Sequence, residues 1–354
     1  MPDTYTSQFS GEEIDAALRA AQIISGASTP AELRKKLEIR GDTIPVSATD
    51  PTPVSEALTA SGGGINPNLL DNWFFGNPVN QKGQTEYTAA GYTIDKWKFN
   101  NNNSDIVIDD TGIMFTAKYQ YAEFEQRYEF PKNISGKQIT MSILADSFSG
   151  EGDFYLVIQN QTEYQTFHLS VGLNSFTTKF FDESSVLRLF IQGQNVNETN
   201  PPKIHLLAAK LELGDTQTLA HKNGGVWVLN EIPDFGEQLR RCQRHAFSPL
   251  YEAYATAIIC NLFVSSVANG VAFGEVTLPV SMRNKPVFSG NASKFWIVAE
   301  NGGGASHPTA ISVMGLSADK VMIQVNGSYT ANTQYILYVE DPFTSADFLL
   351  SADL

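Results

Sequence analysis

The chain has 354 residues and carries 38 acidic against 24 basic side chains, a formal net charge of −14 at pH 7. Because so much negative charge repels the phosphates of DNA and RNA, and no compact basic run is visible, general nucleic-acid binding is excluded. Charged residues make up only 18% of the chain, and Asn, Gln, Thr, Ser and Gly replace them, a bias typical of β-rich extracellular or virion-type proteins.

The first ten residues lack the basic start and the apolar run of a signal peptide. No stretch of the chain approaches the roughly 18 apolar residues that span a bilayer. We therefore expect no membrane insertion. If the protein works outside a cell, we expect it to leave the cell by a route other than an N-terminal secretion signal.

The first predicted element is a short amphipathic helix. Ser10 and Glu13 form a capping box, in which each side chain satisfies a free backbone amide at the helix start. Ile14 and Leu18 then lie on one face, and Phe9 is placed to pack against the first turn. We expect Phe9, Ile14 and Leu18 to serve in virion attachment or oligomerisation.

A second short helix is predicted over residues 31–38, after Thr29 and Pro30. Residues 41–65 contain three prolines and a run of three glycines but no Lys or Arg, which is the chemistry of a linker. Helices this short cannot bury a core of their own. Residues 1–40 are therefore predicted to pack on copies of the chain or on a docking partner.

From Asn66 the periodicity changes from helical to alternating. In residues 123–130, Phe124, Gln126 and Tyr128 share one face with Phe130, while charged side chains alternate with them. Many short strands with turn signals between them predict an antiparallel β-sandwich or jelly roll over residues 66–221. Further strands are predicted at 112–118, 137–146, 153–159, 186–192 and 203–213.

Residues 222–247 are predicted to form a connector with one short helix, because Phe235, Leu239 and Cys242 follow helical spacing. Three arginines lie on the opposite side of this helix: Arg240, Arg241 and Arg244.

A second, smaller β-domain is predicted over residues 248–354, with strands at 256–265, 273–281, 294–300, 319–325 and 334–340. The predicted fold class is therefore mainly β: short N-terminal helices, an antiparallel jelly-roll sandwich, and a smaller C-terminal β-sandwich tip domain.

No residue pattern identifies a catalytic, cofactor or metal site. The five histidines are dispersed, and the sequence contains no HExxH pair, nucleophile elbow or phosphate-binding loop. We therefore predict that the protein is not an enzyme and that it has no catalytic residues, no metal ligands and no cofactor.

Two acidic clusters leave alternatives open. Asp105, Asp109 and Asp110 flank a short strand, where loop carboxylates could hold a structural calcium, although a solvated acidic loop is the favoured interpretation. The second cluster consists of Glu123, Glu125 and Glu129, with Arg127 among them. Its carboxylates could mimic a glycosidase pair, but a solubilising strand face is favoured.

Exposed aromatic rings are the remaining candidates, because rings stack on the apolar faces of sugars. Tyr119 and Tyr121 flank one glutamine, and Tyr164 ends a polar loop. For any single ring, a place in the core is the simpler interpretation. We predict Tyr119, Tyr121, Tyr155 and Tyr164 as the ligand-binding residues.

Cysteine use is sparse. Cys242 and Cys260 are too few for a disulfide framework, so two buried free thiols are favoured, with a single bridge as the alternative.

Several phrases of the sequence resemble a known family. The opening YTSQFSGEEIDAAL, residues 5–18, resembles the N-terminal segment of fibre and adhesin proteins from phages and prophages of gut Firmicutes. Residues 68–97, from NLLDNWFF to GYTIDKW, are similar to the start of their carbohydrate-binding-module-like jelly roll, and AKLELGDTQT, residues 209–218, is similar to its final strand. LRRCQR at 239–244 and VTLPVSMRNKP at 276–286 resemble the connector and a tip-domain strand of such fibres.

The resemblance implies a virion fibre that is assembled in the cytoplasm of a bacterial host. It implies a homotrimer docked on phage tail or capsid proteins through its N-terminus, with β-domains that adhere to host cell-surface glycan. It supplies no sugar-contacting residues. Two alternatives stay open: a structural or decorating head fibre without a specific receptor and, less favoured, a glycan depolymerase.

Overall fold

The computed structural model describes residues 66–352 apart from 130, 180–185, 252, 254–255, 265–269, 301–304 and 318. Among the described residues, Asn68–Gln217 and Ile232–Leu354 belong to one compact unit and Thr218–Glu231 to another. The two predicted N-terminal helices, which include Phe9, Ile14 and Leu18, and the predicted linker lie outside the described residues.

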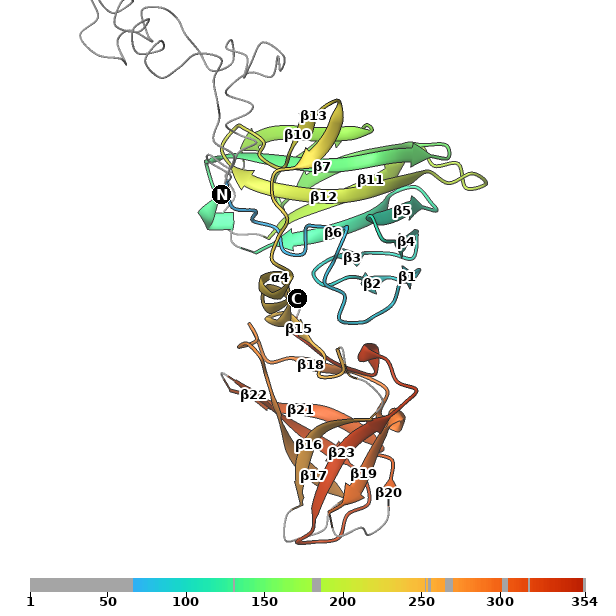
Figure 1. Ribbon diagram of the computed structural model, residues 1–354, viewed down its shortest axis with the longest axis vertical. Coiled ribbons are helices and arrows are strands. Elements are labelled where there is room, and N and C mark those ends of the chain that lie inside the picture. Colours follow the sequence, from blue (N-terminus) through green and yellow to red (C-terminus); the bar gives the residue numbers. More distant parts are fainter. Residues whose placement is uncertain are drawn as a thin grey trace, which may run out of the picture. The chain divides into compact units, whose positions relative to one another are not determined.

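Two six-stranded antiparallel sheets form a sandwich (Figure 1). The first has the order β1 (Glu86–Tyr87), β4 (Ser104–Ile108), β5 (Ile113–Ala117), β12 (Lys203–Leu213), β7 (Gln138–Ser149) and β10 (Gly172–Lys179). The second has the order β2 (Gly91–Tyr92), β3 (Lys98–Phe99), β6 (Ala122–Tyr128), β11 (Leu187–Gln194), β8 (Asp153–Gln159) and β9 (Tyr164–His168).

Large rings fill the space between these sheets. Phe124 of β6 is fully buried and stacks on Trp97, with ring centroids 4.8 Å apart, and its centroid lies 5.8 Å from that of Phe115 in β5. At Gly193 of β11, an added Cβ would lie only 2.2 Å from the Cβ of Ala117, so the close approach of the two sheets requires glycine there.

The unit that includes Thr218–Glu231 contains a β-hairpin of β13 (Ala220–Asn223) and β14 (Val226–Leu229). Gly224 and Gly225 connect the two strands with φ angles of 57° and 88°, the left-handed backbone that a tight two-residue turn requires. The hairpin crosses the boundary at residue 221 that the sequence predicts.

The predicted connector helix is α4 (Phe235–Gln243). Asp234 caps it, because its side-chain oxygen accepts a hydrogen bond of 2.7 Å from the amide of Glu237. Cys242 is fully buried, as the helical spacing predicts.

The buried face of this helix nevertheless differs from the expected one. Phe235 and Leu239 are only half-buried, and Gln238 enters the packed face instead. Its side-chain carbonyl accepts a hydrogen bond of 2.8 Å from the backbone amide of Asn72 in the sandwich. A polar residue is buried there because this hydrogen bond satisfies it, which hydrophobic spacing does not reveal.

The C-terminal region forms a second β-domain. Its larger sheet has the order β20 (Ala305–Ser306), β19 (Phe295–Ala299), β23 (Gln334–Glu340), β16 (Thr256–Val264), β17 (Val271–Thr277), β22 (Lys320–Asn326) and β21 (Ala310–Leu316). A smaller sheet has the order β15 (Ala246–Phe247), β24 (Phe348–Ser351) and β18 (Val287–Gly290). Short 3-10 turns occur at η1 (Pro131–Asn133), η2 (Ala292–Lys294) and η3 (Ser345–Asp347).

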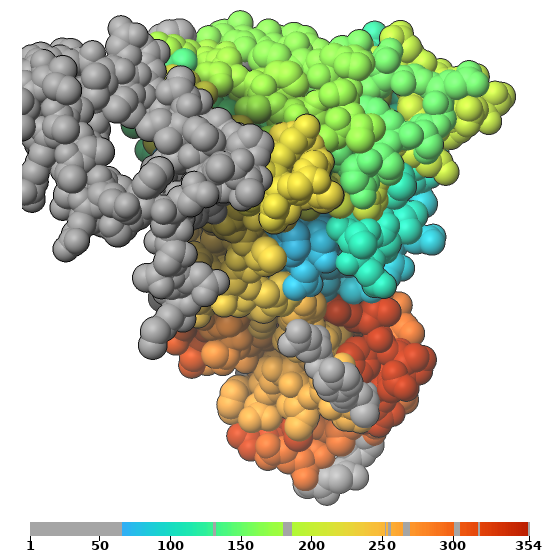
Figure 2. All heavy atoms as spheres, turned by 45° about the horizontal axis from the view of Figure 1, so that its top comes forward, coloured from blue at the N-terminus to red at the C-terminus, as the bar shows by residue number. Residues whose placement is uncertain are grey.

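Side chains from both C-terminal sheets build one core, in which the rings of Phe295 and Phe348 lie 5.6 Å apart. The sandwich contacts this domain through Gln81, which is fully buried: its amide donates to the carbonyl of Ala246 at 2.6 Å and its oxygen accepts from the amide of Ser248. Figure 2 shows the blue segment of the sandwich beside orange and red atoms of this domain.

The mainly β fold class, with an antiparallel sandwich followed by a smaller β-domain, is confirmed. Both cysteines are free and buried. In the part of the chain that the structure describes, no helix has the length and apolar character needed to cross a membrane.

Candidate functional site

On the outward face of the sheet β2–β3–β6–β11–β8–β9, cross-strand register brings polar and aromatic side chains together. Along β6, Phe124 enters the core, so Glu123 and Glu125 lie on the opposite face. We call this surface the polar face; it consists of Tyr92, Lys98, Asn100, Glu123, Glu125, Arg127, Tyr155, Gln159, Tyr164, His168, Arg188 and Gln192.

Glu125 is the centre of the polar face and is completely buried. One carboxylate oxygen accepts hydrogen bonds from Arg188 Nε at 2.7 Å and from Asn100 Nδ2 at 2.6 Å. The other oxygen lies 3.1 Å from Arg127 Nε and 3.2 Å from Lys98 Nζ. Three cations therefore surround one carboxylate and fix it in place.

Arg188 extends this network to the neighbouring strands. It also contacts Glu123 Oε2 at 2.8 Å and donates to Gln159 Oε1 at 3.0 Å. Gln192 Nε2 donates to the second oxygen of Glu123 at 3.1 Å. The guanidinium lies 4.6 Å from the ring centroid of Phe190, a cation–π contact.

These contacts set the charge of the two central groups. Burial opposes ionisation of Glu125, but the charge and hydrogen bonds of Arg188 and the hydrogen bond from Asn100 outweigh it, so the pKa of Glu125 is lowered. Burial likewise disfavours the charged form of Arg188, yet the carboxylates raise its pKa. A glycosidase needs one carboxyl with a raised pKa as general acid, which Glu125 does not provide.

Aromatic rings border the charged centre of the polar face. At one end, Tyr92 lies with its ring centroid 5.7 Å from Lys98 Nζ. At the other end, Tyr155 packs edge-on against His168, with ring centroids 5.2 Å apart, and Tyr164 is 56% exposed. Rings and hydrogen-bonding groups on one surface are the two components that sugar recognition uses.

The structure places the four predicted tyrosines in two groups. Tyr155 of β8 and Tyr164 of β9 lie on the polar face, where cross-strand pairing aligns them with His168 and Gln159. Tyr119 and Tyr121 lie in the exposed turn between β5 and β6, 46% and 57% exposed, away from those registers. The four therefore do not form one cluster.

Sequence reasoning assigned the carboxylate row of β6 to a solubilising surface, and here the structure differs. Glu125 has no exposed area, and its charge is balanced by cations from β3, β6 and β11. Arg188 and Gln192 were missed as site residues. The alternation of Arg188, Phe190 and Gln192 along a predicted strand was the available signal.

The acidic loop that left a calcium site open has protein partners. Asp105 forms an ion pair of 2.8 Å with Lys118. Asp109 accepts hydrogen bonds from Thr111 and from the amide of Gly112, and it lies 3.1 Å from His205 Nε2. Among the described residues, no group of three or more His, Cys, Asp or Glu side chains has the geometry to hold a metal ion.

Comparison with known proteins gives no family assignment. No protein-family model matches the chain, and no curated protein matches it.

Three solved structures are similar in parts of their folds. The CBM22-1 xylan-binding domain of Paenibacillus barcinonensis Xyn10C matches 43% of this chain and 98% of its own, at 8% identity and a TM-score of 0.27. An exo-beta-agarase matches 35% of this chain and 24% of its own, at 12% identity and a TM-score of 0.25. The enzymatically active domain of bacteriophage CBA120 tailspike protein 4 matches 41% of this chain and 21% of its own, at 11% identity and a TM-score of 0.24.

The chain thus spans less than a quarter of the agarase and of the tailspike domain. TM-scores this far below 0.5 carry no argument about function, so the case for a function depends on the polar face itself.

Proposed function

We propose that this protein binds glycan, without cleaving it, through the polar face, and that it works as an adhesive subunit of a virion fibre. One observation carries the glycan-binding part: the rings of Tyr92, Tyr155 and Tyr164 border a fixed set of charged and amide groups on one sheet face. Such rings stack on sugars, while the neighbouring groups exchange hydrogen bonds with hydroxyls.

A second surface supports self-association. The outward face of the larger C-terminal sheet, which we call the apolar face, carries Ile258, Phe263, Phe273, Met322, Ile336 and Tyr338. Ile258 is 68% and Phe263 is 55% exposed. Phe263 pairs with Phe273 and Ile258 with Tyr338 on this face, while Gln334 and Glu275 lie among the apolar side chains. Exposed apolar side chains gathered on one sheet face are typical of an interface, and a homotrimer would bury them between copies.

The fibre assignment itself draws on the resemblance of residues 5–18 and 68–97 to phage fibre proteins. In this proposal the N-terminal segment docks on phage tail or capsid proteins, the protein resides in the virion, and the β-domains face the host. Multivalent binding by three copies would strengthen individually weak sugar contacts.

The test is a glycan array probed with the full-length protein and with two double variants. Tyr155→Ala with Tyr164→Ala removes two rings of the polar face, so we expect loss of array signal. Tyr119→Ala with Tyr121→Ala removes two exposed rings in a turn away from the polar face and serves as the control. Equal loss in both double variants would contradict binding at the polar face.

A blank array for the wild-type protein would instead favour a decorating head fibre without a receptor. Labelling of virions with antibody against the C-terminal domain separates the positions, because a tail fibre is labelled at the tail and a head fibre over the capsid. New reducing ends after incubation with host polysaccharide would overturn the non-enzymatic part of the proposal.

A further inference from the structure

A second polar cavity lies where the end of β6, the helix α4 and the segment before β18 meet. It is a cleft of about 520 Å³. Its walls carry five permanent cations: Lys96, Arg127, Arg241, Arg244 and Arg283. Only two carboxylates line it, Asp71 and Glu129, so the cleft has three more positive than negative charges in a chain whose net charge is −14.

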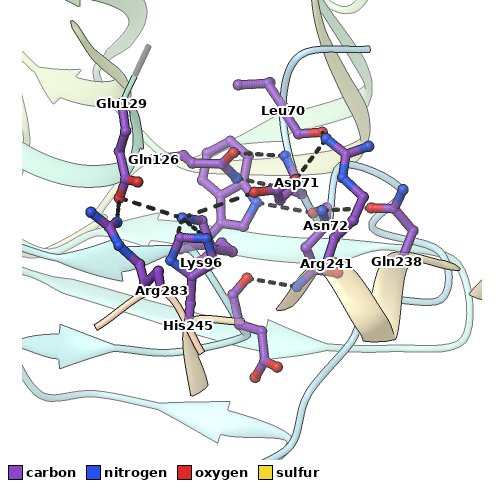
Figure 3. Close-up of polar contacts among 12 residues, drawn as sticks. Leu70, Asp71, Asn72, Lys96, Gln126, Glu129, Gln238, Arg241, His245 and Arg283 are labelled. Atoms are coloured by element: carbon purple, nitrogen blue, oxygen red, sulfur yellow. Dashed lines mark hydrogen bonds and ion pairs between the residues drawn. The ribbon is translucent and has the colours of Figure 1, made fainter. Parts of the chain in front are cut away.

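Both carboxylates of the cleft are already paired with arginine (Figure 3). Arg241 Nη2 lies 2.6 Å from Asp71 Oδ1, and Arg283 forms an ion pair with Glu129. Lys96 Nζ lies between the same two carboxylates, at 3.9 and 3.8 Å. The two carboxylates thus form ion pairs with three cations: Lys96, Arg241 and Arg283.

Two cations of the cleft are not paired with these carboxylates: Arg127, which pairs with Glu125 of the polar face instead, and Arg244. The Arg244 side chain is exposed and, within the described part of the chain, forms no ion pair or hydrogen bond. Its backbone carbonyl accepts a hydrogen bond of 2.9 Å from the amide of Arg283, which holds the two arginine backbones together at the cleft.

The helix dipole explains only part of this arrangement. Arg240 and Arg241 occupy the last turn of α4 and Arg244 is its C-cap residue, and cations there are favoured by the partial negative charge of a helix C-terminus. The dipole does not explain why Lys96 and Arg283, from other segments, converge on the same cleft.

The cleft walls are fixed before any ligand arrives. The backbone amide of Asp71 donates to Gln126 Oε1 at 2.8 Å, and Gln126 Nε2 donates back to the carbonyl of Asp71 at 2.7 Å. Lys96 Nζ lies 3.1 and 3.2 Å from the ring nitrogens of His245. Preorganised donors lose little entropy on binding, which favours recognition of a small charged group.

We propose that this cleft binds the oxyanion, carboxylate or phosphate, of an acidic glycan. The inference rests on the proposed glycan binding and adds the class of glycan. Arg127 links the two surfaces, because it lines the cleft and also pairs with Glu125 of the polar face. Guanidinium groups suit this task, since their planar donors match carboxylate and phosphate oxygens.

The test compares three probes on the full-length protein by calorimetry and ligand-observed NMR: an oligogalacturonate, a glycerol-phosphate oligomer and a neutral oligosaccharide of equal length. We expect at least one anionic probe to bind more tightly than the neutral one, with an affinity that falls as salt is added. The first two probes separate a carboxylate source from a phosphate source.

Arg244→Ala is the decisive variant, because that side chain has no ion pair to lose and the fold should be unchanged. We expect the affinity for the anionic probe to fall roughly tenfold. Arg240→Ala is the matched control: it removes the same charge from an exposed position of the same helix, outside the cleft.

Equal losses in the two arginine variants, or no preference for anionic probes, would overturn the inference. Glycan binding at the polar face would then still stand if the tyrosine variants lose array signal. If the wild-type protein binds anionic probes through Arg244 while the tyrosine variants bind the array normally, the cleft is retained and the polar face is rejected.

Discussion

The polar face of the sandwich and the apolar face of the larger C-terminal sheet differ in how far their side chains are covered from solvent. The polar face of the sandwich carries charge and still buries it, since Glu125 is completely covered by the cations around it. The apolar face of the C-terminal sheet has its ion pair of Lys320 with Glu275 in solvent and leaves Ile258 and Phe263 exposed as well. The difference separates the roles proposed for them: aromatic rings and fixed polar groups for a small ligand on the polar face, exposed apolar side chains for a large partner on the apolar face.

The largest expected effect concerns the apolar face. Phe263→Arg places a charge within the proposed interface, so we expect the assembly to dissociate completely into monomers. Light scattering after size exclusion measures this directly. Val107→Arg, at an exposed position of the sandwich, is the control and should leave the mass unchanged. A wild-type protein that is already monomeric at micromolar concentration would refute the trimer.

On the polar face, Arg188→Ala should lower the free energy of unfolding by about 2 to 4 kcal/mol, because it leaves the buried Glu125 without its main partner. Urea unfolding of the variant, of Glu125→Gln and of the double variant gives the coupling between the two residues. A coupling near zero would mean that Lys98 and Arg127 alone suffice to hold the carboxylate.

A fall in pH should destabilise the protein through Glu125 on the polar face, by less than the loss of Arg188 does. The pKa of Glu125 is lowered in the folded protein, so its contribution to stability is complete above the ordinary carboxyl pKa and is lost as the pH falls through the lowered value. Thermal unfolding between pH 7 and pH 3 should therefore show a smaller acid destabilisation in Glu125→Gln than in the wild type. Identical pH profiles would contradict this assignment.

The smallest effect is expected at an exposed ion pair of the C-terminal sheet. Lys320 Nζ lies 2.8 Å from Glu275, closer than Lys98 Nζ lies to Glu125 at 3.2 Å, but both side chains of the pair are about half exposed. Because solvent screens such pairs, Lys320→Ala should leave the melting temperature unchanged. A clear drop would show that distance outweighs burial in this protein.

The alternation of apolar and polar residues predicted the central strands well and the edge strands poorly. The predicted strands 153–159, 203–213 and 334–340 agree with β8, β12 and β23 at both ends. β8 and β23 bury an apolar side chain at alternate positions, so their period is visible, whereas β12 is buried along most of its length and contains a register shift. β9 and β10, at the edges of the two sandwich sheets, were missed, because edge strands bury less and their exposed polar residues hide the period.

The polar face was only partly predictable for a related reason. Tyr155 and Tyr164 were predicted as ligand-binding residues, and the structure places both on one sheet face. The pairing of Arg188 with Glu125 joins residues 63 apart in sequence, through the register between β11 and β6. A single sequence shows which residues alternate along a strand, but not which strand lies beside it.

The rate at which a thiol reagent labels the two buried cysteines can report local opening of the fold. Burial, the largest influence on both thiols, raises the pKa of Cys260 to about 12 and also raises that of Cys242. A thiol reagent can therefore react with either residue only when its surroundings open. Since Cys242 lies in α4 and Cys260 in the C-terminal sheet, the two labelling rates would follow separate parts of the molecule, with no engineered probe.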